Sequence, residues 1–166
     1  MKNRFAHFSI RFLSVLLAGV FLLLLRTVTQ NPVCALLTPQ FASPWELSKL
    51  VFWPLLLAAA IPLRDGGKFL SRLPWLTAAP VAAVLIFWAL SALKPGPGVY
   101  LLIWVVLSAA ALVLAQRGVL AGGDRSVWLV LAVAMGILYI VLTFLPPMVG
   151  PFLDPSDVAA MATIPC

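Results

Sequence analysis

The chain has 166 residues, of which 63% are apolar and only 10% are charged. Soluble domains carry about 45–50% apolar and about 25% charged residues, so this composition excludes a water-soluble globule. The formal net charge is +6, which in a soluble protein would raise nucleic acid as a partner. Here the basic residues lie in short loops beside apolar segments, where a lipid bilayer explains them better. We therefore expect the bilayer as the surroundings of the chain and no nucleic-acid partner.

Five apolar segments follow one another along the chain, and each predicts a helix. The predicted helices span about residues 10–28, 45–63, 75–93, 99–116 and 127–145, and a tail covers 146–166. Apolar runs of about 17–25 residues can cross the roughly 30 Å hydrocarbon layer of a bilayer as helices. The apolar run of the second segment is the shortest. The prediction is an all-α fold in which residues 1–166 form a single transmembrane domain, a bundle of five transmembrane helices.

The distribution of basic residues predicts the orientation, because cytoplasmic loops carry an excess of Lys and Arg. With five crossings and a cytoplasmic N-terminus, eight of the 11 basic residues face the cytoplasm: Lys2, Arg4, Arg11, Arg64, Lys68, Arg72, Arg117 and Arg125. Arg26, Lys49 and Lys94 then lie outside. If the second segment did not cross, most basic residues would lie outside instead. We therefore expect the N-terminus in the cytoplasm and the C-terminus on the outer side.

The second predicted helix has a recognisable start in Ser43-Pro44-Trp45-Glu46. Ser43 is a typical N-cap residue, Pro44 suits the first helical position, and Glu46 at the third can bond back to the cap. Lys49 follows three residues after Glu46, on the same helix face. Arg26 ends the first helix on the same side of the membrane. Because charge near hydrocarbon is costly unless it is paired, we expect an Arg26–Glu46–Lys49 cluster at the outer boundary.

This outer polar cluster has two interpretations. As a functional site, it would be the entry for a solute or ion, and Pro54, Pro62 and Pro80 would free backbone groups near the midplane to bind that solute. As a structural feature, it is a capping box with interfacial charges, and the prolines only kink packed helices. We favour the structural interpretation because the spacing explains Glu46 without a ligand. A purely capping Glu46 would tolerate replacement by Gln.

The tryptophans are distributed as in a membrane protein. Trp45, Tyr100 and Trp104 fall near the predicted outer interface, as residues of an aromatic belt do. Trp88 lies deeper in its segment, where a packed helix face is the expected environment.

A resemblance to a known family appears in the same region. The stretch Pro32–Pro39, followed by Ser43-Pro-Trp-Glu-Leu-Ser-Lys-Leu-Val-Phe-Trp-Pro54, resembles a family of small bacterial integral membrane proteins of unknown function. The family's entry to the second helix has the form Ser-x-Trp-Glu-x-x-Lys-Leu-x-Phe-x-Pro, and this chain has Leu47 where the family usually has His. The resemblance covers about a seventh of the chain. It implies a multi-pass protein of the bacterial cytoplasmic (inner) membrane and supplies no activity.

The only two cysteines, Cys34 and Cys166, both fall on the outer side in this topology. A bacterial periplasm permits disulfides, so either a Cys34–Cys166 bond or two free thiols is compatible with the sequence. Asp154-Pro155 predicts a short helix over about 155–161. Val158, Met161 and Phe152 are expected either to pack on the bundle or to lie on the lipid surface.

The sequence offers no candidate for catalysis. His7 is the single histidine, and the predicted spans contain no set of His, Cys or carboxylate ligands that could converge on a metal. We therefore expect no catalytic residues, no metal and no cofactor. The expected function is that of a non-catalytic accessory or assembly subunit that acts through helix packing, with other membrane subunits or a second copy as partners. The alternative is a small transporter or channel with a polar vestibule on its outer face.

Overall fold

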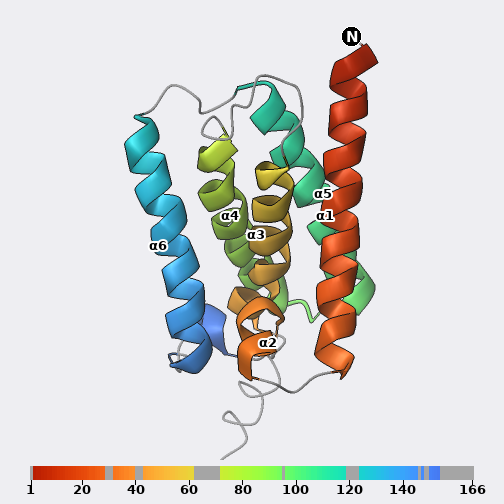
Figure 1. Cartoon of the computed structure of the whole chain (residues 1–166). Helices are drawn as coiled ribbons and strands as arrows, with labels where there is room; N and C mark the ends of the chain where they lie inside the picture. The colour runs from red at the N-terminus through yellow and green to blue at the C-terminus, as the bar shows by residue number, and fades with distance from the viewer. Residues whose placement is uncertain are drawn as a thin grey trace, which may run out of the picture.

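The computed structural model describes residues 2–28, 32–39, 43–61, 72–94, 96–118, 124–145, 147 and 150–153, and no strand occurs among them. The described helices are α1 (Lys2–Val28), α2 (Pro32–Leu37), α3 (Pro44–Ala60), α4 (Leu73–Ser91), α5 (Pro97–Gln116), α6 (Arg125–Phe144) and the short 3₁₀ helix η2 (Gly150–Phe152). The long helices run up and down in one bundle (Figure 1). The predicted all-α fold is confirmed.

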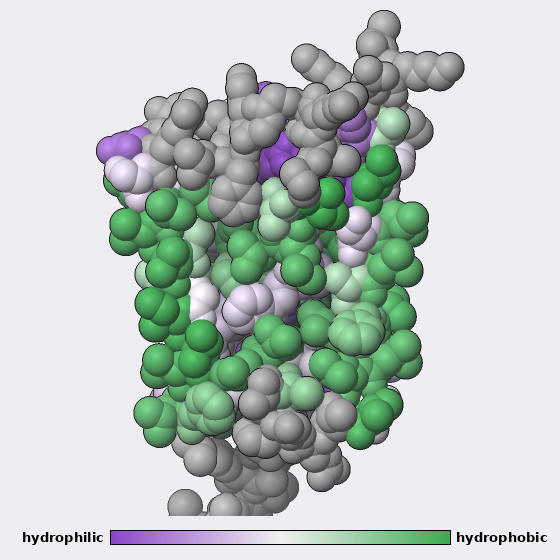
Figure 2. Space-filling model, viewed as in Figure 1, coloured by the Kyte–Doolittle hydropathy of each residue, from purple (hydrophilic) through white to green (hydrophobic). Residues whose placement is uncertain are grey.

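Four of these helices are long and apolar enough to cross a membrane. They are the segments Ala6–Val28, Leu73–Ser91, Pro97–Gln116 and Ser126–Phe144. Helix α3 has 17 residues and carries two charges, and it is not one of the four. Apolar side chains cover the flanks of the molecule, over α1 and α6, while hydrophilic residues gather at the end where α1 begins (Figure 2). The molecule has the surface of a membrane-spanning protein.

Helix α3 occupies the middle of the bundle. It packs against α1, α4 and α5, and η2 covers part of it as well. Twelve of its 17 residues are buried, whereas in α6 only Ala132, Met135 and Tyr139 are. A helix surrounded by protein needs no apolar surface toward lipid, which explains how α3 can be short and partly polar. Its neighbours supply most of the apolar exterior.

The helix ends follow from local sequence. Prolines take an early position in α3, α4 and α5, where the missing N–H is not needed. The Asp124 side chain accepts the N–H of Ser126 at 3.0 Å and caps α6. Gly118 follows the end of α5 with φ of 71°, the left-handed conformation that terminates many helices and that glycine adopts without strain.

The structure differs from the sequence prediction in three places. Helix α1 begins at Lys2 rather than near residue 10, so the basic head is itself helical. The connection between α1 and α3 contains α2, which hydropathy does not predict because the helix has only six residues. The predicted environments of three tryptophans were wrong: Trp45 and Trp104 are buried inside the bundle, and Trp88 is 51% exposed on its surface.

Candidate functional site: a buried ion pair on the central helix

The N-cap predicted for the first turn of α3 is present. Ser43 is the N-cap residue, and its hydroxyl accepts the backbone N–H of Glu46 at 3.3 Å. Pro44 follows at the first helical position. This cap fixes where α3 begins, and therefore which of its residues face inward.

Glu46 and Lys49 form an ion pair inside the protein. The Lys49 Nζ lies 2.6 Å from the Glu46 Oε1, and the side chains are 0% and 7% exposed. Lys49 also donates to the Ala35 carbonyl of α2 at 3.1 Å and to the Thr143 Oγ1 of α6 at 2.7 Å. An ammonium group has three hydrogens, and these three acceptors account for all of them. The pair thus connects α2, α3 and α6.

A second hydrogen-bond chain, which starts at Ser48, links α3 and α6. The Ser48 hydroxyl donates to the Trp45 carbonyl at 2.6 Å and lies 2.5 Å from the Tyr139 hydroxyl. Because Ser48 has a single hydroxyl hydrogen, Tyr139 must be the donor of the second bond. The Thr143 hydroxyl donates to the Tyr139 carbonyl at 2.5 Å and is therefore free to accept from Lys49.

Tyr139 and Thr143 were missed as site residues in the sequence. They are four residues apart on α6, so they share a face. Apart from Trp128, they are the only residues in the sequence of the apolar run 127–145 whose side chains carry an N–H or O–H group. Two polar side chains on one face of an apolar helix could have indicated the site, but the sequence alone does not show which helix that face contacts.

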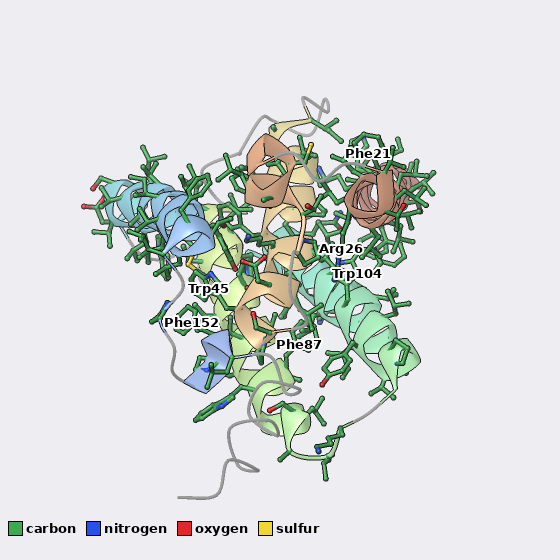
Figure 3. All side chains as sticks on the ribbon, turned by 90° about the horizontal axis from the view of Figure 1, so that it is seen from below. Phe21, Arg26, Trp45, Phe87, Trp104 and Phe152 are labelled. Atoms are coloured by element: carbon green, nitrogen blue, oxygen red, sulfur yellow. The ribbon has the colours of Figure 1, made fainter. Side chains whose placement is uncertain are left out.

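Aromatic rings enclose this network. Trp45 packs on Tyr139 with ring centroids 4.7 Å apart and on Phe152 of η2 at 5.1 Å, and Figure 3 shows Trp45 and Phe152 side by side. Phe52, two turns further along α3 than Trp45, contacts Tyr139 with ring centroids 5.0 Å apart. Of the two placements expected for Phe152, the structure shows packing on the bundle. These rings bury Tyr139, which is 0% exposed, at the α6 end of the network.

Arg26 and Cys34, which were also predicted as site residues, are less buried than the pair. Arg26 is exposed in the last turn of α1, on the side of that helix that faces the bundle (Figure 3). The structure therefore buries Glu46 and Lys49 and leaves Arg26 at the surface. Cys34 is half-buried on α2. Cys166 and the predicted helix 155–161 lie outside the described residues, so the disulfide stays a prediction.

The C-terminal carbonyls of α2 accept hydrogen bonds from side chains, two of which belong to α3. Its Cys34 carbonyl accepts from the N–H and the hydroxyl of Thr38 at 2.9 and 2.8 Å. Lys49 bonds the next carbonyl, and the Trp53 Nε1 bonds the Leu36 carbonyl at 3.1 Å. The last carbonyls of a helix have no partner within it and carry a partial negative charge. Two side chains of α3 thus cap a helix too short to be stable alone.

Pro54 interrupts α3 and frees the Leu50 carbonyl, which would otherwise accept the N–H of residue 54. The Trp104 Nε1 of α5 donates to this carbonyl at 2.7 Å. Room for the indole exists because Gly19 of α1 has no side chain: a Cβ there would lie 2.2 Å from the Trp104 ring. The carbonyl that the transport interpretation assigned to a solute is therefore occupied by a neighbouring helix.

Taken chemically, the site is an internal cross-link. One carboxylate, one ammonium and three hydroxyls bond one another and backbone carbonyls across three helices. Within the described ranges, no three His, Cys, Asp or Glu residues lie close enough to hold a metal ion. Comparison with protein-family models, curated proteins and solved structures gives no match for this chain.

Proposed function

We propose that this chain is a non-catalytic integral membrane protein that acts through helix packing, as an accessory or assembly subunit of a larger membrane complex. The observation that carries the proposal is the Lys49 ammonium, whose three hydrogens are all bonded within the bundle. A charge satisfied in this way stabilises one arrangement of helices and offers little to a passing solute. Partners would be other membrane subunits or a second copy, together with the surrounding lipid.

The proposed topology has five crossings, with α3 as the second, the N-terminus in the cytoplasm and the C-terminus in the periplasm. Helix α3 lies alongside the four long helices (Figure 1), and its 17 residues span about 26 Å at 1.5 Å per residue. That length nearly crosses a hydrocarbon layer of about 30 Å. The excess of basic residues in the predicted cytoplasmic loops supports the orientation.

Cysteine labelling of intact cells tests this topology. A membrane-impermeant maleimide should modify a Lys94→Cys variant and spare a Lys68→Cys variant. Both should react after the cells are opened, which controls for cysteines that are simply inaccessible. The reverse labelling pattern would contradict the five-crossing model. The bacterial cytoplasmic membrane, and membership of the family that the Ser43–Pro54 motif resembles, belong to the same proposal.

A matched pair of variants tests the function. Replacing both charges, by Glu46→Leu with Lys49→Met, removes the ion pair without leaving a buried charge unpaired. If the pair is structural, the double variant should co-purify from its native membrane with the same partner chains as the wild type. Glu46→Leu alone should lose both fold and partners. A folded double variant that loses its partners, or a wild type that purifies only as a homo-oligomer, would contradict the accessory role.

A small transporter or channel is the second candidate. The observation that favours it is the exposed Arg26 at the end of the bundle near which α3 begins, which could guide an anion toward the Glu46–Lys49 pair. In that case the double variant would keep its fold and lose transport in reconstituted vesicles. If the double variant retained transport, the Glu46–Lys49 pair could not be part of a transport vestibule.

A further inference from the structure

Four of the five tryptophan and tyrosine residues that are not buried lie within one turn of a helix end. Trp75 and Trp128 are half-buried in the first turns of α4 and α6, which begin at the same end of the bundle as α1 (Figure 1). Trp88 and Tyr100 lie at the opposite end, in the last turn of α4 and the first turn of α5. The fifth, Trp53, lies in the middle of α3 and donates its N–H to α2. Tryptophan and tyrosine at helix ends gather where hydrocarbon meets the lipid headgroups, so the four residues form two aromatic layers at the edges of the hydrocarbon.

The two aromatic layers lie closer together than the edges of an ordinary bilayer. On α4, Trp75 and Trp88 are about 20 Å apart along the helix axis, at 1.5 Å per residue. Side chains on a helix lean toward its N-terminus, so both indoles are displaced in the same direction and their separation stays the same. The hydrocarbon of a typical bilayer is about 30 Å thick.

Polar side chains on two other helices have a similar separation. Arg11 and Arg26 of α1 are about 22 Å apart along the axis, and Arg11 lines the same small pocket as Trp75, which places it beside that aromatic layer. On α6, Trp128 is about 22 Å from Thr143, which accepts a hydrogen bond from the buried ion pair. Three helices therefore place their polar and aromatic residues about 20–22 Å apart.

The apolar segments alone would fit a different bilayer. They have 19–23 residues and span about 28–35 Å, which matches ordinary hydrocarbon. A polar group drawn into hydrocarbon costs more than an apolar side chain left among the headgroups, because only the polar group loses its hydration. We therefore expect the polar and aromatic layers to determine which lipids fit the chain.

We propose that the lipid-facing surface of this chain matches a hydrocarbon layer of about 22 Å, so that it binds phospholipids with short acyl chains in preference to longer ones. A bilayer that is thicker than the protein it surrounds has to thin locally, at a cost that grows with the mismatch. The inference rests on the membrane-spanning topology of the proposed function but not on any partner subunit. It can therefore hold if co-purification finds no partner, and fail if a partner is found.

Lipid competition in reconstituted vesicles measures the match. The purified full chain is placed in phosphatidylcholine with monounsaturated chains of 14, 18 or 22 carbons, each mixed with a brominated phosphatidylcholine that quenches tryptophan fluorescence. The common headgroup leaves chain length as the only variable. The 14-carbon lipid should displace the brominated lipid about threefold more effectively than the 22-carbon lipid, because mismatch costs accumulate with each ångström. Strongest binding at 18 or 22 carbons, or binding that does not depend on chain length, would overturn the proposal.

Two variants of identical composition test whether the aromatic layer sets the thickness. Trp88→Leu with Leu93→Trp moves the indole outward, just beyond the end of α4, and Trp88→Leu with Leu85→Trp moves it inward by about one turn. Leu85 and Leu93 are 56% and 74% exposed, so both variants should keep the thermal stability of the wild type. The outward variant should weaken the preference for 14-carbon chains, and the inward variant should keep or strengthen it. Equal preferences in the two folded variants would overturn the assignment of the thickness to this layer.

Discussion

The bond between Trp104 and the Leu50 carbonyl can be tested without knowing the function. Trp104→Phe removes the indole N–H that donates to this carbonyl at 2.7 Å. Pro54 has no N–H, so α3 itself cannot replace the lost donor. Leu50 is 4% exposed, so water cannot replace it either. The variant should leave one buried acceptor unsatisfied.

The magnitude follows from the burial of the bond. An unsatisfied buried acceptor costs about 1–3 kcal/mol, while hydrogen bonds between membrane helices average about 0.6 and reach about 1.7 kcal/mol. We therefore expect about 1–2 kcal/mol for the lost bond, with a further loss from the smaller ring. Pro54→Ala restores an N–H one turn from the Leu50 carbonyl. In that background Trp104→Phe should cost about 1 kcal/mol less.

A double-mutant cycle isolates this coupling. The free energy of unfolding is measured for the wild type, both single variants and the double variant in mixed micelles by titration with a denaturing detergent. Trp88→Phe, at a tryptophan that is 51% exposed, is the control and should show no coupling to Pro54. Additive effects of Trp104→Phe and Pro54→Ala, within about 0.5 kcal/mol, would refute the explanation.

Three more predictions concern single positions. Gly19→Ala should destabilise the protein by about 1–3 kcal/mol, because its Cβ would overlap the Trp104 ring; unchanged thermal stability would contradict the close approach of α1 and α5. Glu46→Gln should lower the free energy of unfolding by about 3–5 kcal/mol, because it leaves the Lys49 ammonium buried without its carboxylate. Unchanged thermal unfolding of this variant would instead support a purely capping role for Glu46. The bonds from Ser126 lower the pKa of Asp124 below its usual value. Its contribution to the start of α6 should therefore be present above about pH 4 and be lost as the pH falls through the lowered pKa. Amide exchange at Ser126 measures this, and an equally strong acid dependence in Asp124→Asn would contradict it.

The helices and the start of α3 could be predicted because their signals are local. Apolar runs place α4, α5 and α6 to within about two residues of where they lie, and the Ser43 cap depends on residues three positions apart. The pairing of Glu46 with Lys49 is equally local. The burial of that pair could not be predicted, because it depends on Thr143, 94 residues away.

The same dependence on long-range contacts explains why the environment of Trp104 was predicted wrongly and why α3 does not have the composition of the four long apolar helices. Trp104 is equally compatible with an aromatic belt and with the core until its acceptor on α3 is known, and that acceptor exists only because Pro54 frees it. Hydropathy identifies helices that face lipid. Helix α3 contacts protein on most sides, so its residues are suited to packing against other helices and not to contact with lipid. Its hydropathy therefore does not identify it as a span.

The partners of Lys49 also become available at different times during synthesis. Glu46 and Ala35 precede Lys49 in the chain, so two of its three acceptors exist when α3 first leaves the ribosome. Thr143 is made 94 residues later, which takes about 5–20 s at ordinary elongation rates. During that interval α3 carries an incompletely coordinated charge and lacks the face of α6 that will cover it. Its stable entry into the bilayer must therefore be completed by the last long helix, so truncation before α6 should leave the middle of the bundle poorly inserted.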